Sequence, residues 1–546
     1  MVAGWLFLAL AVTVTQATGG WPALARQQPA ASSAMSETVL AWGGNGRGAL
    51  GNGTTTDSPV PVEAELPANT TITAIAAGNG HSVALTSDGA VLAWGRNASG
   101  QLGDGTTNNS STPVVVNLPP NTTITAIAAG HSHSLAVTST GTVLAWGYNY
   151  YGQLGNGTNN HSNTPVNVNL PTGTTITTIA AGAGHSLATT TAGTALAWGG
   201  NYSGQLGNGT NNHSNTPLNV NLPTGTTITT IAASASHSLA TTTAGTALAW
   251  GGNYSGQLGN GTNNHSNTPL NVNLPTGTTI TTIAAGAGHN LATTTAGTTL
   301  AWGSNNYGEL GDGTSTDSDV PVVVNLPPNT TVTAIAAGAG HSLATTTAGT
   351  ALAWGGNYSG QLGNGTNNHS NTPLNVNLPT GTTITTIAAG NDHSMALTEP
   401  PSSTTALEVS PRNPEPDQDV TLTATVTCTT SAPTGTITFR NGSSDLHTMP
   451  LDGTNTATHT TRLPAGTHTL TAHYTSTNTC PSGQSEATTI TIDTPTSPGP
   501  DTPDDPGLPT TGPSLPTTIG AAALLLLTGT TLIHLARRRR PTHQSH

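Results

Sequence analysis

The string ALAWGGNYSGQLGNGTNNHSNTPLNVNLPTGTTITTIAA occurs three times without change, at residues 195–233, 247–285 and 351–389. Looser versions fill the chain around these copies. The tryptophan of each Ala-Trp-Gly recurs every 52 residues, at Trp42, Trp94, Trp146, Trp198, Trp250, Trp302 and Trp354. A fixed period of this size is typical of a solenoid or a propeller. Seven units without drift leave no room for separate domains between them.

Each unit has a β pattern. The segment TTITTIAAG at 174–182 is rich in β-branched residues, and strict alternation places Ile176 and Ile179 on opposite faces of a strand. Large apolar groups on both faces indicate a strand lying between two sheets. A short turn then joins HSLATT to TALAWG, and in the second unit this turn reads TSDG, a strong hairpin signal. The Gly- and Asn-rich segment 199–215 predicts a long loop.

About four short strands in each of seven units predict an all-β, seven-bladed propeller. An open β-solenoid is the weaker alternative, because its repeats are usually shorter and need distinct end caps. The hairpin is cut at both ends of the repeat region: TVLAWG at 38–43 has no upstream partner, and HSMALT at 393–398 has no downstream partner. Because an unsealed ring exposes sheet edges, we expect these two segments to pair in one mixed blade.

The pattern AWGxNxxGQLGxGT followed by IAAGxxHSLALT resembles the regulator-of-chromosome-condensation repeat family over residues 37–398. The Gly-Gln-Leu-Gly string begins at Gly100, Gly152, Gly204, Gly256 and Gly360, with the variants GALG at Gly48 and GELG at Gly308. The resemblance implies a seven-bladed propeller. The founding member is a nucleotide exchange factor for a small nuclear GTPase; its long insertions are not matched here, so guanine nucleotide exchange is only a distant alternative.

Charge is scarce in this chain. It contains no Lys, its ten basic residues are all Arg, and charged residues make up 6% of the total. No charged residue occurs between Gly105 and Gly308, where Thr, Asn, Gly and Ser dominate. This predicts a polar, neutral surface. Nucleic acid is not an expected partner, because phosphate binding needs a basic stripe.

Residues 1–25 are typical of a signal peptide, with an apolar core WLFLALAV at 5–12 and small residues ALA at 23–25. No Lys or Arg precedes the core, so the signal is atypical or the start codon is placed too late. A buried hydrophobic strand is the alternative. We expect an extracellular protein.

Residues 404–493 alternate Thr with apolar residues between turns, which predicts a small β-sandwich. The pieces GTITFRNG and LPAGTHTLTAHY resemble a bacterial immunoglobulin-like repeat. The chain's two cysteines, Cys428 and Cys480, lie here. An even pair in a small exported domain predicts a disulfide, worth up to ~4 kcal/mol, whereas a metal site would need further ligands.

A Pro- and Asp-rich linker at 494–507 precedes LPTTG, whose residues are Leu508, Pro509, Thr510, Thr511 and Gly512. An apolar stretch from about 515 to 536, expected as one hydrophobic helix, and Arg537–Arg540 complete residues 508–546. This order resembles an LPxTG-type cell-wall sorting signal. The resemblance implies a sortase partner that attacks the Thr511 carbonyl and joins Thr511 to peptidoglycan, after a transient membrane stage. A plain transmembrane anchor with a chance motif is the alternative.

Two histidine sets follow the repeat. The first contains His81, His133, His185, His237, His289, His341 and His393. Because one lies in every unit, we expect these to be structural, each bonding its own hairpin. The second set, in the loops, contains His161, His213, His265 and His369. We interpret these as exposed polar residues, with a weak metal-binding rim as the alternative. We expect no metal and no cofactor.

Tyrosines occupy matching places in several loops, at Tyr150, Tyr202, Tyr254 and Tyr358, with Tyr148 and Tyr151 beside the first. Aromatic and amide side chains on a neutral ring suit a glycan or a protein loop, although packing against the next blade is an equal interpretation. The leading hypothesis is therefore a non-catalytic, wall-anchored, monomeric binding or adhesion propeller. The alternatives are an inhibitor of secreted enzymes, such as the propellers of this repeat family that bind β-lactamases, and a propeller lyase or glycosidase.

Overall fold

The computed structural model describes residues 38–429, 432–478 and 480–494. The predicted signal peptide at 1–25, the LPTTG motif at 508–512, the expected C-terminal helix and the Arg tail all lie outside the described residues. The described segments are all-β, and none of their elements is a helix of the length and apolarity needed to span a membrane.

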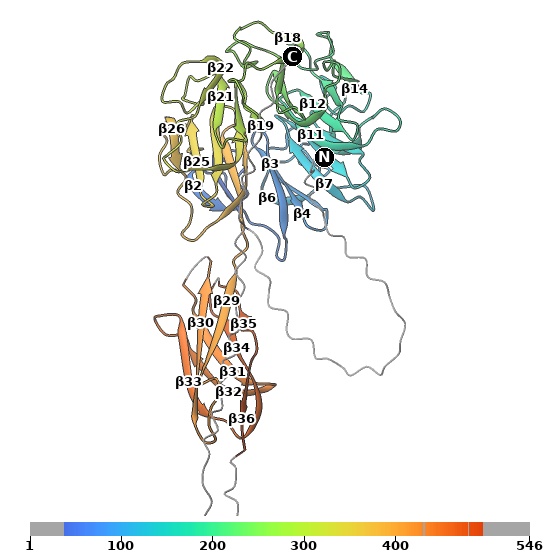
Figure 1. The fold of residues 1–546 in the computed structure, drawn as a ribbon. Coiled ribbons are helices and arrows are strands. Elements are labelled where there is room, and N and C mark those ends of the chain that lie inside the picture. The colour runs from blue at the N-terminus through green and yellow to red at the C-terminus, as the bar shows by residue number, and fades with distance from the viewer. Residues whose placement is uncertain (1–37, 430–431, 479, 495–546) are drawn as a thin grey trace, which may run out of the picture. The chain divides into compact units, whose positions relative to one another are not determined.

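Seven four-stranded antiparallel sheets form the repeat region, so the predicted seven-bladed propeller is confirmed. Blade 1 has the order β2-β1-β28-β27, and blades 2 to 7 are built in chain order from β3–β6, β7–β10, β11–β14, β15–β18, β19–β22 and β23–β26. Figure 1 shows these sheets arranged about a common centre.

Each blade places its strands in the same order from the centre outward. The innermost strands are β3 (Ile72–Ala77), β7 (Ile124–Ala129), β11 (Ile176–Ala181), β15 (Ile228–Ala233), β19 (Ile280–Ala285), β23 (Val332–Ala337) and β27 (Ile384–Ala389). The second strands are β4 (His81–Thr86), β8 (His133–Thr138), β12 (His185–Thr190), β16 (His237–Thr242), β20 (His289–Thr294), β24 (His341–Thr346) and β28 (His393–Thr398). The third strands are β1 (Val39–Gly43), β5 (Val91–Gly95), β9 (Val143–Gly147), β13 (Ala195–Gly199), β17 (Ala247–Gly251), β21 (Thr299–Gly303) and β25 (Ala351–Gly355). The outer strands are β2 (Ser58–Glu63), β6 (Ser110–Val115), β10 (Ser162–Asn167), β14 (Ser214–Asn219), β18 (Ser266–Asn271), β22 (Ser318–Val323) and β26 (Ser370–Asn375).

The third strand of each blade is buried on both faces, because its alternation of large and small residues fits the neighbouring blades. In blade 4, Leu196 and Trp198 pack against Val143 and Ala145 of blade 3. The Trp198 ring is fully buried, and its Nε1–H donates to the carbonyl oxygen of Gln153 in blade 3 at 2.9 Å. All seven repeat tryptophans are buried in the same way. Blades are thus joined by apolar packing and by one indole hydrogen bond at each interface.

The innermost strand departs from strict alternation. Ile176 and Ile179 were expected on opposite faces, but both pack into the cluster between blades 3 and 4. The register of β11 shifts between Ile176 and Thr178, which inserts one residue into the strand. A bulge of this kind brings residues three apart onto the same face. The expectation of opposite faces was therefore wrong.

The ends of the repeat region close the ring, as predicted. Strand β1 pairs antiparallel with β28 over five residues, from Val39 opposite Leu397 to Gly43 opposite His393. The outer strands of blade 1 therefore come from the N-terminal end and its inner strands from the C-terminal end. The pairing leaves no blade with an open hairpin among the described repeats.

The second domain is a sandwich of two sheets around one apolar core that includes Val420, Phe439 and Tyr474. One sheet contains β29 (Ser403–Ser410), β30 (Asp419–Cys428) and β33 (Thr456–Arg462). The other contains β31 (Gly435–Asn441), β32 (Ser444–Pro450), β34 (Gly466–Ser476), β35 (Gly483–Gln484) and β36 (Thr488–Ile492).

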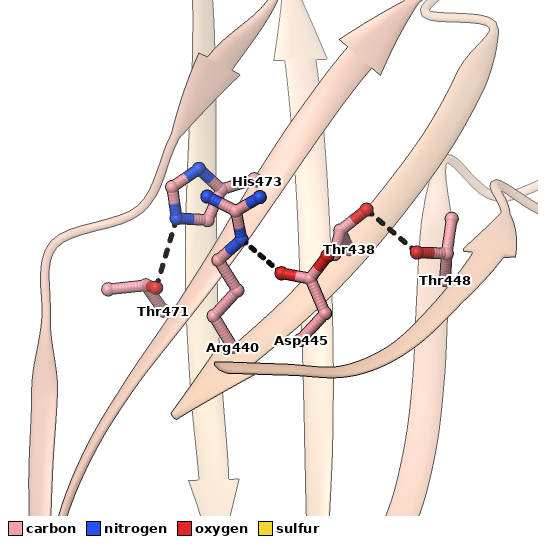
Figure 2. Close-up of polar contacts among 6 residues, drawn as sticks. All are labelled: Thr438, Arg440, Asp445, Thr448, Thr471 and His473. Carbon is pink, nitrogen blue, oxygen red and sulfur yellow. Dashed lines mark hydrogen bonds and ion pairs between the residues drawn. The ribbon is translucent and has the colours of Figure 1, made fainter. Parts of the chain in front are cut away.

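The outward face of the second sheet is lined by polar pairs, shown in Figure 2. Arg440 Nε donates to Asp445 Oδ1 at 2.6 Å, and the hydroxyls of Thr438 and Thr448 are 2.9 Å apart. The inward neighbours Ile437 and Phe439 are fully buried. This is the alternation expected of a strand with one solvated face.

The two cysteines of this domain are neighbours, but the structure holds them as thiols rather than as the predicted disulfide. Burial raises the pKa of the Cys480 thiol to about 12, and hydrogen bonding with Cys428 adds to the rise. Formation of the disulfide stays a prediction.

Candidate functional site

One end of the propeller carries the variable loops. In every antiparallel blade, the turn between the first and second strands and the long loop between the third and outer strands emerge at the same end. We call this end the loop face. It brings the AAGxGH turns beside the segments that contain the tyrosines, and three surface hollows are lined by both loop types.

A buried asparagine braces each long loop. In blade 4, Asn201 is fully buried; its Nδ2 donates to the carbonyl oxygens of Thr210 and Asn212, and its Oδ1 accepts from the Leu206 amide at 2.8 Å. The equivalent residues are Asn45, Asn97, Asn149, Asn253, Asn305 and Asn357, all fully buried. Sequence reasoning treated this segment only as a Gly- and Asn-rich loop. The Asn that always stands two residues after Trp-Gly was the signal that it missed.

The loop histidines cap these braces. His213 Nδ1 accepts the backbone N–H of Asn201 at 2.8 Å, and His161, His265 and His369 do the same in their blades. The Tyr202 ring lies 4.2 Å from the His213 ring, edge to face. The second histidine set therefore orders the loops and supports the tyrosines. The structure brings no three His, Cys, Asp or Glu side chains of the described residues together at a metal-like spacing.

The candidate tyrosines are on the surface. Tyr150, Tyr202, Tyr254 and Tyr358 are 63%, 67%, 71% and 66% exposed. Tyr151 lies edge to face with Tyr202 of the next blade, with ring centroids 5.6 Å apart. A matching pair, Tyr307 and Tyr358, has centroids 5.5 Å apart. Sequence reasoning missed Tyr307, although it occupies the same place in the repeat as Tyr151.

The first aromatic pair borders a hollow of about 410 Å³ that we call the arginine hollow. Its lining residues come from blades 2 to 5 and include Arg96, His131, Tyr148, Tyr151, Tyr202 and Gln205. No Asp or Glu of the described residues lines it. Burial, and then the Arg96 charge, lower the pKa of His131. Arg96 is therefore the positive charge of this hollow at neutral pH.

The second pair borders a hollow of about 470 Å³ that we call the glutamate hollow. Its side chains include Tyr307, Glu309, Tyr358, Gln361 and Asp392. Glu309 stands where five other blades have Gln and blade 1 has Ala49, and burial raises the pKa of its carboxyl. The two hollows thus combine nearly equal aromatic geometry with opposite charge.

The hollow on the propeller axis offers little chemistry. It holds about 230 Å³ and is lined mainly by the Ala-Ala-Gly ends of the innermost strands, with Asn79, His131 and Asn391 at its edge.

The first histidine set forms a ring between blades, which corrects the expectation that each bonds its own hairpin. His133 Nε2 lies 3.0 Å from Ser186 Oγ of the next blade, and that hydroxyl donates to the Gln153 carbonyl. The Nε2 atom must therefore carry the proton and donate it. Burial lowers the pKa of His133 to about 3, so the ring is neutral at pH 7. These histidines join adjacent blades through hydrogen bonds and are structural, rather than metal ligands or catalytic bases.

Comparisons with known proteins agree with this architecture. Residues 34–399 match the family model described as RCC1-like domain, and residues 407–493 match the model described as bacterial Ig-like domain (group 3). The chain is 32% identical over 326 residues to the ultraviolet-B receptor UVR8 of Arabidopsis thaliana, covering 60% of this chain and 74% of the receptor. It is 34% identical over 315 residues to human E3 ubiquitin-protein ligase HERC2, covering 57% of this chain but 6% of that protein.

Solved structures show the same fold. Human WBSCR16 aligns with a TM-score of 0.61 at 26% identity, covering 67% of this chain and 99% of that chain. Prp20p from Saccharomyces cerevisiae, described by its binding to Gsp1p and histones, aligns with a TM-score of 0.60 at 24% identity, covering 67% and 92%. At that identity the likeness shows the fold alone.

Proposed function

Because the chain belongs to the RCC1-like domain family, we propose that its propeller is a non-catalytic binding scaffold, exported and anchored to a cell wall. The ligand is a glycan or a protein that binds the loop face. The named relatives include a light receptor and a ubiquitin ligase, so the fold alone does not define the activity. The proposal rests on the site.

The main support for this proposal is the row of exposed tyrosines on the loop face, which carries little charge and whose loops are held in place by buried Asn side chains. Rings that are 63–71% exposed are unusual for large aromatic side chains, and here each stands on a loop held by a buried Asn. Such a surface is pre-organised, so binding costs little loop entropy. Aromatic rings next to amides and hydroxyls recognise sugar rings or protein loops by packing and hydrogen bonds, without a charge requirement.

Export and anchoring are supported by the chain ends and by the immunoglobulin-like domain. The order of LPTTG, apolar stretch and Arg tail at 508–546 matches the chemistry of wall attachment. A sortase thiolate attacks the Thr511 carbonyl and the Gly512 amine leaves, which gives a thioester. An amine of peptidoglycan then displaces the thiol and forms an amide with Thr511. Sortase and peptidoglycan are therefore the proposed processing partners.

Glycan and protein arrays probed with residues 26–511 test the binding proposal. Changing Tyr150, Tyr202, Tyr254 and Tyr358 together to Ala should abolish binding, because the packing surface is lost. The matched control changes four exposed turn threonines at the opposite end of the blades to Ala, and binding should persist. These are Thr191, Thr243, Thr295 and Thr347. Binding that survives the tyrosine changes would place the ligand elsewhere.

A further inference from the structure

We propose that the arginine hollow binds a carboxylated sugar residue, with Arg96 receiving the carboxylate and the Tyr151–Tyr202 pair receiving the sugar ring. The inference rests on the proposed function and deepens it by naming a ligand class for one hollow.

The first support is an unpaired charge. Arg47 and Arg96 are the cations within residues 38–398. Neither side chain forms an ion pair or a hydrogen bond with any residue that the structure describes, whereas Arg440 and Arg462 of the second domain both pair with Asp. The guanidinium of Arg96 has five N–H donors in a planar fork that matches a carboxylate. No ion pair with a described residue holds the Arg96 guanidinium, although Asp57 and Asp392 line an adjacent hollow that Arg96 also borders.

The second support is an amide donor at the hollow that has no hydrogen-bond partner among the described residues. Gln205 is only 6% exposed, and its Oε1 accepts the Ser203 amide at 2.9 Å. Its Nε2 makes no hydrogen bond with the described residues, and the side chain lines the hollow. The matching Nε2 atoms of Gln101 and Gln153 are sealed inside the protein instead. A sugar hydroxyl is an acceptor of the size that would satisfy this amide.

The third support is the shape of the hollow. Tyr151 and Tyr202 meet edge to face at 84°, so their rings form a corner. Residues without long side chains, including Gly184 and Gly200, line the same hollow and leave room for a sugar ring to approach. A volume of about 410 Å³ is that of a small-molecule site. A protein partner would need a much broader contact area, about 800 Å² on each side.

The glutamate hollow is a natural comparison. Its pair Tyr307–Tyr358 has the same 84° geometry, but Glu309 and Asp392 replace the cation. The aromatic corner alone should accept neutral sugars in both hollows. A carboxylate should be accepted only beside Arg96, because Glu309 and Asp392 repel it.

The test measures binding of two probes to the full chain in detergent by calorimetry. One probe is a short oligoglucuronate and the other is its carboxyl-reduced counterpart, which keeps the rings but has no charge. We expect the acidic probe to bind at least about tenfold more tightly, the strength of one charge-assisted hydrogen bond pair. Rising salt concentration should reduce the difference in affinity between the two probes, because it screens the charge interaction.

Two variants each replace an Arg by the residue that other blades carry at that position. Arg96→Ser introduces the residue found at Ser304, and Arg47→Ser the residue found at Ser203. Arg96→Ser should remove the preference for the acidic probe while leaving neutral binding, and Arg47→Ser should preserve the preference. Equal binding of both probes, or a preference that survives Arg96→Ser, would overturn the inference while leaving the proposed function intact.

An oligoglutamate peptide completes the design. If the peptide binds as tightly as the oligoglucuronate, and Arg96→Ser abolishes this binding, the site recognises acidic protein segments and the sugar assignment is wrong. If none of these probes binds the wild-type chain, this inference fails, whereas the loop-face function is decided separately by the arrays probed with residues 26–511.

Discussion

His393 and Ser82 lie 311 residues apart in the chain, yet His393 Nε2 is 3.0 Å from Ser82 Oγ in the closed ring. This contact completes a circle of seven buried histidines, each bonded to the next blade. Six end on a Ser hydroxyl, whereas His237 ends on Asn290 Oδ1 at 2.7 Å. Asn290 also donates to the Gln257 carbonyl, as the Ser residues do to theirs, so the exchange preserves both bonds.

Acid should unfold the propeller cooperatively. Burial lowers the pKa of the ring histidines from 6.5 to about 3 in His81 and about 4 in His237. Because the unfolded chain binds protons first, stability is complete above pH 6.5 and falls as the pH drops toward these values, by about 1.4 kcal/mol per pH unit for each histidine. Melting followed by tryptophan fluorescence between pH 7.5 and 4.5 measures this. A melting temperature independent of pH in that range would contradict it.

The seam of the ring should be as strong as the interior. Ser82→Ala leaves the His393 donor buried without an acceptor, which costs about 1–3 kcal/mol. Ser186→Ala removes the same pair of bonds between blades 3 and 4, to His133 and to the Gln153 carbonyl. Urea unfolding should show equal losses for the two variants. A much larger loss at Ser82 would identify blade 1 as a weak closure.

Loop order should depend on the buried brace. Asn201→Ala removes the amide acceptor and donors that hold residues 206–212, so the loop should lose its order although Tyr202 itself is not mutated. We expect faster amide exchange across 202–213 and weaker ligand binding at the arginine hollow. Asn253→Ala, one blade further along, is the control: it should leave this hollow unchanged, and weakening by both variants alike would argue against a local role.

The thiol pair should be slow to alkylate, yet close enough to form a disulfide when an oxidant is supplied. With its pKa raised to about 12, Cys480 stays protonated at pH 8, and the folded, reduced chain should react with iodoacetamide far more slowly than after unfolding. Under an oxidising buffer the pair should form the predicted disulfide, visible as a loss of two hydrogens in intact mass. Rapid alkylation of both thiols in the folded chain would contradict their burial and pairing.

Wall anchoring should end the mature chain at Thr511. Mass spectrometry of protein released by peptidoglycan digestion should find Thr511 joined to a wall fragment. Thr511→Ala or Pro509→Ala should hold the protein in the membrane fraction with its Arg tail. Recovery of wild-type protein in the membrane, still ending at His546, would favour a plain transmembrane anchor.

Much of the fold could be predicted because the repeat displays it many times. The 52-residue step, the hairpin between HSLATT and TALAWG, and the two cut ends led to the correct blade number and closure. Alternation failed at Ile179, because an inserted residue changes the face without leaving a mark in composition. The histidine partners were missed because bonding across blades requires knowing which strands face each other.

The site was only partly predictable. Position in the repeat and composition identified the exposed tyrosines, but the arginine hollow depends on four blades meeting at one face. Arg96, Tyr151 and Tyr202 lie in consecutive repeats, and only the geometry of the ring brings them together. The charge contrast between the two hollows comes from single departures from the repeat, Arg96 and Glu309, which periodicity averages away.

The mixed blade also constrains the order of events during biogenesis. Strand β1 is synthesised early, whereas its mate β28 follows more than three hundred residues later. Until then blade 1 lacks its inner strands and the ring is open. The contacts that close it are among the longest-range in the chain, which makes them slow to form. If the chain crosses a membrane N-terminus first, the propeller therefore cannot close before its last repeat has crossed. Ring closure would then take place on the far side of the membrane.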